Sequence, residues 1–160
     1  MVLELKQVSK TVGGETHIYP TDMVLEAGEF NILLGTTISG KTSLMQLMAG
    51  LDRPTSGQVW FNGLDVTEMP VQKRNVSMVY QQFINYPNMT VFENIASPLR
   101  VAKLPDKKMR SRVGEIAEIL RISSMLERRP SELSGGQQQR VAIARALVKD
   151  SSLILFDEPL

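Results

Sequence analysis

The sequence predicts an α/β fold with an antiparallel β part at the front and a helical part inserted in the middle. First, the apolar run at residues 30–34 leads into a glycine-rich loop, and apolar residues then recur at helical spacing from Lys41. Second, turn-bounded alternating segments precede that run. Third, the middle of the chain carries helix-start signals. Strand, loop and helix in direct succession form half of a βαβ unit, which builds parallel sheets.

Length and composition limit the classes of function. With 160 residues the chain has room for about one domain, and 42% hydrophobic with 22% charged residues is typical of a globular protein. Eighteen basic and seventeen acidic residues leave a net charge of +1, which provides no general attraction for nucleic acid. We therefore expect no nucleic-acid partner. The absence of cysteine excludes disulfides, thiolate catalysis and cysteine-based zinc sites, and His17 is the only histidine.

Short strands are predicted before and after the first helix. Residues 1–30 alternate in polarity, with breaks at residues 13–14 and 27–29, and further strands are expected at residues 58–61 and 76–80. The N-terminus lacks the apolar core of a signal peptide, and no apolar stretch approaches the 18 residues that span a bilayer. We therefore expect a cytoplasmic protein.

The middle third predicts helices. Thr90 and Glu93 form a capping-box pattern, and residues 84–130 are expected to be mostly helical. Ser134 and Gln137 form a second capping box that opens another helix, and a buried strand is expected at residues 153–156.

Residues 35–42 match the phosphate-loop pattern, and they lie between the predicted strand and helix. In such a loop, backbone N–H groups surround phosphate oxygens at a helix N-terminus, Lys41 adds a positive charge, and the Thr42 hydroxyl can bind Mg²⁺. The alternative is a glycine loop that only connects strand to helix. The predicted nucleotide-binding residues of this loop are Gly35, Thr36, Thr37, Ile38, Ser39, Gly40, Lys41, Thr42 and Ser43.

Two acidic residues follow the last predicted strand. Asp157 at the end of this strand can hold Mg²⁺ through water, and Glu158 can orient an attacking water. The alternative is an ordinary solvated strand end.

The segment at residues 133–137 predicts a second anion site. Ser134, Gly135, Gly136 and Gln137 place a hydroxyl and exposed N–H groups at a helix start. The alternative is an ordinary helix cap with a glycine-rich lead.

Taken in this order, the three motifs resemble those of the ATP-binding subunit of an ABC transporter, over the whole chain. Residues 35–42 resemble Walker A, residues 133–137 the signature motif, and residues 153–158 Walker B. Gln81 resembles the Q-loop glutamine. The segments at residues 87–94 and 137–147 resemble the sugar and glycerol importer branch.

The resemblance implies a phosphate-loop NTPase fold, in which about residues 1–83 and 134–160 form the core and about residues 84–133 a helical subdomain. It implies ATP and Mg²⁺ as cofactors, Glu158 as general base with Gln81 beside it, and Thr42, Gln81 and Asp157 as metal ligands. The signature residues Ser134 and Gly136 would contact ATP held by a second ATPase subunit.

The resemblance also implies partners. Residues 82–86 would relay the nucleotide state to membrane permease subunits at the cytoplasmic face of the membrane. The similarity of residues 81–98 to the corresponding segment of that importer branch suggests a polyol such as glycerol as the transported solute. Two alternatives are a soluble ABC-type ATPase of translation or DNA repair, for which we would expect a basic surface or a coiled-coil insertion, and a degenerate subunit that binds nucleotide with little turnover.

Three departures from the family pattern lead to further expectations. Val12 replaces the aromatic residue that usually stacks on adenine, with His17 and Tyr19 as the only nearby substitutes, so we expect weaker adenine binding. Ile38 replaces a frequent glycine. The D-loop, the switch histidine and a strand that inserts beside residues 30–34 would follow Leu160, so we expect the 160 residues alone to be poorly stable and inactive.

Overall fold

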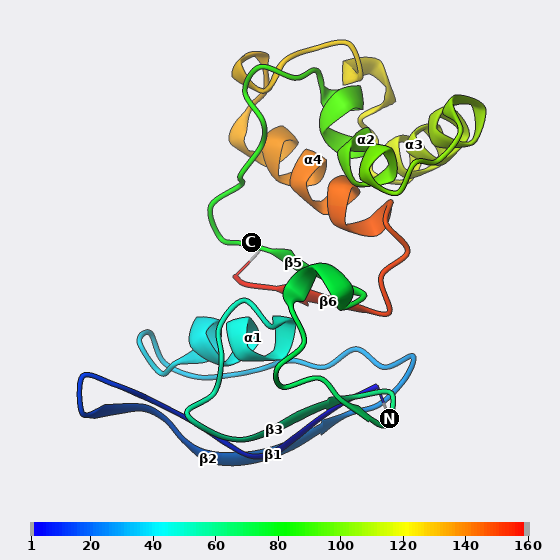
Figure 1. The fold of residues 1–160 in the computed structure, drawn as a ribbon. Coiled ribbons are helices and arrows are strands. Elements are labelled where there is room, and N and C mark those ends of the chain that lie inside the picture. The colour runs from blue at the N-terminus through cyan, green and yellow to red at the C-terminus, as the bar shows by residue number, and fades with distance from the viewer. Residues whose placement is uncertain (1, 159–160) are drawn as a thin grey trace. The chain divides into compact units, whose positions relative to one another are not determined.

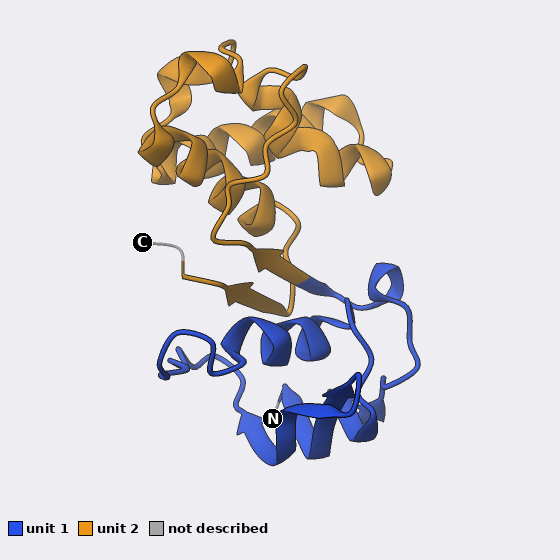
Figure 2. Cartoon of the chain, turned by 90° about the vertical axis from the view of Figure 1, so that its left-hand side faces the viewer, with its two compact units in different colours: residues 1–76 blue, residues 77–160 orange. Residues whose placement is uncertain are grey.

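The computed structural model describes residues 2–158, which fall into two compact units. Unit 1 ends at residue 76 and unit 2 begins at residue 77 (Figure 2). No helix among the described residues is long and apolar enough to cross a membrane.

Unit 1 contains a four-stranded antiparallel sheet in the order β2-β1-β3-β4 (Figure 1). The turn at Asn62 and Gly63 has φ values of 49° and 78°, as expected for a tight hairpin. This sheet confirms the predicted antiparallel front part. Its strands are β1 Leu3–Val12, β2 Glu15–Leu25, β3 Ser56–Phe61 and β4 Leu64–Asp65.

Helix α1, Lys41–Ala49, lies over one face of this sheet (Figure 1). It ends as predicted at Gly50, whose φ of 78° lets its N–H reach the carbonyls of Gln46 and Leu47. A short 3₁₀ helix, η1 Val71–Lys73, precedes the end of the unit. The core joins apolar side chains of the sheet and the helix, among them Leu3, Leu5, Val8, Ile18, Val59, Leu44, Leu47 and Met48.

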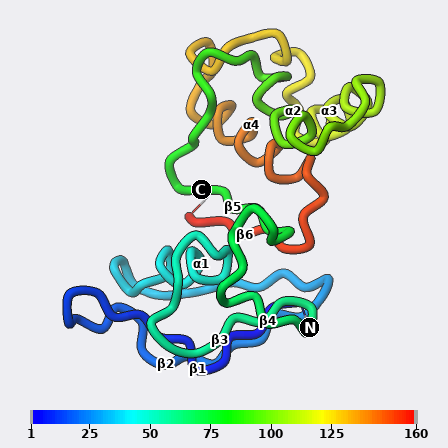
Figure 3. The backbone as a smooth tube through the Cα atoms, viewed as in Figure 1, coloured from blue at the N-terminus to red at the C-terminus, as the bar shows by residue number. Residues whose placement is uncertain are grey.

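The predicted buried strand at residues 30–34 is wrong. The segment forms no strand, and Phe30 and Leu34 are 86% and 85% exposed. Figure 3 shows it as an irregular tube leading to α1. An apolar run becomes a buried strand only when neighbouring strands satisfy its backbone groups, and no described strand pairs with it.

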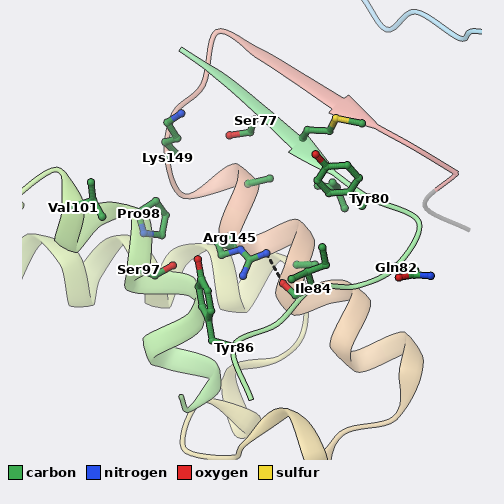
Figure 4. Close-up of a pocket in the computed structure, with 14 residues that line it drawn as sticks. Ser77, Tyr80, Gln82, Ile84, Tyr86, Ser97, Pro98, Val101, Arg145 and Lys149 are labelled. Carbon is green, nitrogen blue, oxygen red and sulfur yellow. Dashed lines mark hydrogen bonds between the residues drawn. The ribbon is translucent and has the colours of Figure 1, made fainter. Parts of the chain in front are cut away.

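Unit 2 combines three helices with a two-stranded sheet. The hydroxyls of Ser77 and Ser151 lie 2.6 Å apart, and Asp157 N–H donates to the Val79 carbonyl at 2.9 Å. The later residue of one strand therefore pairs with the later residue of the other, so β5 and β6 run parallel (Figure 4). Apart from Val76, the last residue of unit 1, its elements are β5 Val76–Val79, α2 Val91–Val101, α3 Asp106–Ile119, η2 Ser123–Met125, η3 Pro130–Glu132, α4 Gly135–Leu147 and β6 Leu153–Phe156.

Both predicted capping boxes are present. Thr90 caps α2 with Glu93 as its reciprocal partner, and Ser134 caps α4 with Gln137. The prediction of mainly helical structure at residues 84–130 is confirmed, because α2 and α3 occupy much of it and share an apolar core with α4. The first residues, 84–90, are instead an irregular connection.

Asn94 holds this irregular connection against α2. Its side chain is fully buried, and Oδ1 accepts from Tyr86 N–H at 2.7 Å. Its Nδ2 donates to the carbonyls of Tyr86, Met89 and Thr90 at 2.9–3.2 Å. One amide therefore satisfies both the N–H and the carbonyl of Tyr86 and ties the connection to the start of α2.

Arg74 plays the corresponding part in unit 1. It is only 5% exposed, and its guanidinium donates to five backbone carbonyls. Two of these belong to the last turn of α1, where a positive charge opposes the negative end of the helix dipole. Burial lowers the pKa of Arg74, an effect that nearby Asp65 opposes. The five acceptors are Leu47, Met48, Val66, Thr67 and Met69.

We predict that Arg74→Met lowers the free energy of unfolding by about 3 kcal/mol, because buried carbonyls lose a charged donor. Urea unfolding of the intact protein measures this. Arg53→Met is the matched control, since its ion pair with Glu68 lies at the surface and should be worth at most about 1 kcal/mol. Equal losses for the two variants would contradict a special role for Arg74.

Candidate functional site: a phosphate loop, a strand edge and a helix N-terminus

The loop at residues 35–42 wraps around the first residue of α1. Lys41 Nζ donates to the carbonyls of Gly35 at 2.9 Å and Thr36 at 2.8 Å. Ser39 N–H closes a turn onto Thr36 at 3.2 Å. The first turn of α1 has neither a side-chain cap nor an acidic residue. A helix N-terminus without its own anionic side chain suits a bound anion.

Two glycines allow the loop to approach its surroundings closely. A Cβ atom at Gly40 would lie 2.7 Å from Ile18 Cδ1 and 3.3 Å from the His17 carbonyl oxygen, and the φ of Gly40 is 86°. A Cβ at Gly35 would lie 2.5 Å from Ser39 Oγ. A side chain at Gly40 would crowd residues of β2, and a side chain at Gly35 would crowd Ser39 within the loop. Glycine at both positions therefore fits a tight phosphate-binding loop.

Ile38 stands in a backbone conformation that suits glycine. Its φ is 68°, and its side chain is 98% exposed. A β-branched side chain in the left-handed region clashes with its own backbone, and no packing offsets that cost here.

In unit 2, two predicted site residues meet beyond the carboxyl ends of the parallel strands. Gln81 Nε2 donates to Glu158 Oε2 at 3.1 Å. Asp157 is buried, and its N–H extends the pairing between the strands. Amide and carboxylate groups thus gather at the edge where open α/β sheets bind ligands. Among the described residues, no three acidic or histidine side chains form a metal cluster by themselves.

The N-terminus of α4 is an open polar surface. Ser134, Gly135 and Gly136 are exposed, and a Cβ at either glycine would meet nothing within 4 Å. Ser134 Oγ accepts from Gln137 N–H at 3.4 Å, and Gln137 Oε1 accepts from Ser134 N–H at 2.9 Å. The signature segment is therefore a formed helix cap with free space in front of it within unit 2.

A cavity of about 270 Å³ lies between β5, the connection at residues 82–86, α2 and α4 (Figure 4). Arg145 donates to the Ile84 carbonyl at 2.5 Å and lies 5.1 Å from the centre of the Tyr86 ring. Its buried Nη1 has no hydrogen-bond partner among the described residues. Burial lowers the pKa of Arg145, and Tyr86 opposes this. Arg145 thus connects α4 to the segment that follows Gln81.

The structure brings together only some of the predicted residues. Gln81, Asp157 and Glu158 share one strand edge of unit 2, whereas the signature residues stand at the start of α4. The phosphate loop belongs to unit 1. Sequence reasoning missed Arg74, Asn94 and Arg145. Asn94 and Arg145 belong to the segments at residues 87–94 and 137–147 that carried the family resemblance, but nothing in the sequence showed which backbone groups they bind.

Comparison with known proteins identifies the family. The family model described as ABC transporter matches residues 19–160. The chain belongs to the ABC transporter family. This confirms the resemblance drawn from the three motifs.

Several members of the ABC transporter family are similar over nearly the whole chain. The Fe(3+) ions import ATP-binding protein FbpC of Vibrio cholerae is 45% identical over 98% of the chain. The sn-glycerol-3-phosphate import ATP-binding protein UgpC of Escherichia coli K12 is 43% identical, and the spermidine/putrescine import ATP-binding protein PotA of Aggregatibacter actinomycetemcomitans 40%, each over 99% of the chain. The chain covers 44%, 45% and 43% of these three relatives, less than half their length.

A solved structure confirms the predicted α/β fold of an ABC ATPase. The dimeric post-hydrolysis state of the ATP-binding cassette MJ0796, bound to ADP and Pi, is 31% identical with a TM-score of 0.88. The match covers 98% of this chain and 74% of that one.

We predict that Ile38→Gly raises the free energy of unfolding by about 1 kcal/mol, because glycine removes the strain at positive φ. Thermal unfolding of the intact protein measures the change. Thr37→Gly is the matched control, since Thr37 is not among the residues with positive φ and should lose about 0.5–1 kcal/mol of stability through backbone entropy. If both variants are destabilised alike, Ile38 is not strained.

Proposed function

We propose that this chain binds and hydrolyses ATP as part of the ATP-binding subunit of a membrane importer. The observation that carries the proposal is the phosphate loop. A Cβ atom at Gly35 or Gly40 would crowd its neighbours, Lys41 donates to carbonyls of the loop, and the helix that follows begins without an acidic residue in its first turn. Membership in the ABC transporter family supports ATP as the ligand.

In this proposal the loop binds the β- and γ-phosphates. Lys41 exchanges the carbonyls of Gly35 and Thr36 for phosphate oxygens, which are stronger partners because they are charged. The N–H groups of the loop and of the first turn of α1 donate to the same phosphates.

Mg²⁺ would supply charge neutralisation on the phosphates when bound. We propose Thr42, Gln81 and Asp157 as the residues that hold it, directly or through water. A hydroxyl, an amide and a carboxylate are oxygen donors, and oxygen is the ligand that this cation requires.

Glu158 is our proposed general base, with Gln81 as its neighbour at the site. A base must lie within hydrogen-bond reach of the water it activates, and the contact of 3.1 Å with Gln81 keeps the carboxylate at the strand edge. Gln81 can donate to the same water and orient it for attack on the γ-phosphate.

We propose that the helix start at Ser134–Gln137 contacts a nucleotide that is bound by a second ATPase subunit. Its hydroxyl and glycine backbone are exposed, and nothing in unit 2 lies against the positions where glycine side chains would be. The similar cassette MJ0796 was solved as a dimer bound to ADP and Pi. We infer a dimer in which each signature segment contacts ATP on the partner.

The second partner is a membrane permease that the subunit meets at the cytoplasmic face. Residues 82–86 would transmit the nucleotide state, because they directly follow Gln81 and are held by Arg145 and Asn94. Residues 84–133 would then be a helical subdomain, and residues 1–83 and 134–160 the catalytic core. Relatives at 40–45% identity are named for import of iron ions, spermidine/putrescine and glycerol 3-phosphate, which supports a small solute as the substrate class. Within that class we propose a sugar or a glycerol-type polyol.

We predict that Lys41→Ala abolishes ATP binding while the fold is retained, because the loop loses its only lysine. Isothermal titration calorimetry of the intact protein with MgATP measures the affinity. Lys103→Ala, a change outside the loop, should bind ATP normally. Native affinity in the Lys41 variant would reject the phosphate loop as the ATP site.

We also predict that Glu158→Gln retains ATP binding but lowers turnover by at least about a hundredfold, because an amide cannot accept the proton of the attacking water. Phosphate release and nucleotide affinity are measured on the same preparation. This variant also tests the alternative of a degenerate subunit, which Val12 favours and the intact Lys41 and Glu158 disfavour. If the native protein turns over ATP no faster than the variant, the subunit binds nucleotide without hydrolysing it.

A further inference from the structure

Positive charge is concentrated where α2 ends and α3 begins, within unit 2 (Figure 1). Residues 100–112 contain six of the eighteen basic residues of the chain and one acidic residue, Asp106. Outside this segment, twelve basic residues stand against sixteen acidic ones, so the remainder of the chain is net negative. The net charge of +1 therefore conceals a basic segment in an otherwise weakly acidic protein.

Four basic side chains of this segment are exposed and have no carboxylate within ion-pair distance among residues 2–158. The other two are already paired, since Arg100 lies 3.9 Å from Glu93 and Arg112 lies 2.6 Å from Asp150. The four that are open to a partner form what we call the basic patch: Lys103, Lys107, Lys108 and Arg110.

The packing of α3 holds the basic patch in place. Met109 is 6% exposed and belongs to the apolar core that α2, α3 and α4 share. With Met109 on the buried side of the helix, Lys107 and Lys108 face solvent. The Arg110 guanidinium lies 5.4 Å from the centre of the Phe92 ring, which holds this cation at the helix surface. The patch is therefore carried by a packed helix.

The positions of these charges oppose the local preferences of the backbone. Lys103 has a φ of 56° in the turn after α2, where glycine is the usual residue. Lys107 and Lys108 lie in the first turn of α3, where the helix dipole favours acidic side chains. Positive charge placed against both preferences indicates a role other than folding.

An apolar side chain lies beside the basic patch. Val101, the last residue of α2, is 85% exposed and precedes Lys103 by two positions. Basic residues next to an exposed apolar residue suit an anionic bilayer, because cations meet headgroup phosphates while the apolar group enters the boundary with the acyl chains. A long nucleic acid would also meet the net negative remainder of the chain, whereas a bilayer surface can contact one patch alone.

We propose that the basic patch binds the anionic headgroups of a membrane surface. This contact uses none of the residues of the proposed ATP site and goes beyond the proposed permease contact. Each Lys or Arg near an anionic surface strengthens binding by about fivefold, so four of them give an attraction of roughly several hundredfold. The attraction falls off within a Debye length, so added salt must weaken it.

The test measures how much of the intact protein sediments with vesicles of phosphatidylcholine that contain or lack phosphatidylglycerol. We expect binding only to the vesicles with phosphatidylglycerol, and weaker binding as the salt concentration rises. The double variant Lys107→Gln and Lys108→Gln should bind these vesicles at least about tenfold more weakly. The double variant Lys107→Arg and Lys108→Arg keeps both charges and should bind within about twofold of the native protein.

The double variant Arg121→Gln and Arg128→Gln is the matched control, because it removes two exposed positive charges of unit 2 outside the patch. It should bind vesicles as the native protein does. The inference is overturned if the native protein does not bind phosphatidylglycerol vesicles, if it binds neutral vesicles equally well, or if both glutamine variants lose affinity equally. Tighter binding to polyuridine than to the vesicles would also overturn it, since the patch would then serve nucleic acid.

Discussion

The site depends on the close approach of the phosphate loop to strand β2. At Gly40 a side chain would be crowded, because a Cβ atom would lie 2.7 Å from Ile18 Cδ1 and 3.3 Å from the His17 carbonyl oxygen, and the φ of 86° disfavours any residue but glycine. Gly40 is the residue just before α1, so this contact lies at the helix end whose N–H groups are open to a ligand. The proposed phosphate site therefore depends on the packing of the loop against β2.

The other end of α1 is fixed as firmly. Arg74 bonds the carbonyls of its last turn and those of a neighbouring segment of unit 1, and Lys10 donates to Asp52 at 2.7 Å and to the Arg53 carbonyl just after the helix. The hydrogen bond from Lys10 lowers the pKa of Asp52. In unit 2, Asn94 and Arg145 likewise use polar side chains to hold an irregular connection. Regular structure places the motifs, and buried polar groups fix the loops between them.

Several helix ends and turns could be predicted from the sequence, because they depend on short local patterns. The caps at Thr90 and Ser134, the turn at Asn62 and the glycine after α1 depend on residues within a few positions of one another, and all four are present. The strand at residues 30–34 was wrong because its formation depends on partners, which an apolar run does not specify. Arg74 and Arg145 were missed because their acceptors lie up to 61 residues away in sequence. Their roles emerge only from the tertiary structure.

The most direct test of this account is the ATP affinity of Gly40→Ala compared with Gly63→Ala, measured by calorimetry on the intact protein. Both glycines have positive φ, 86° and 78°, so both substitutions introduce similar backbone strain. Only at Gly40 would the new methyl group collide with neighbouring atoms, because nothing lies within 4 Å of a Cβ at Gly63. The account predicts that Gly40→Ala loses ATP binding, whereas Gly63→Ala retains it with a modest loss of stability. Native ATP affinity in Gly40→Ala would contradict the claim that this packing contact forms the site.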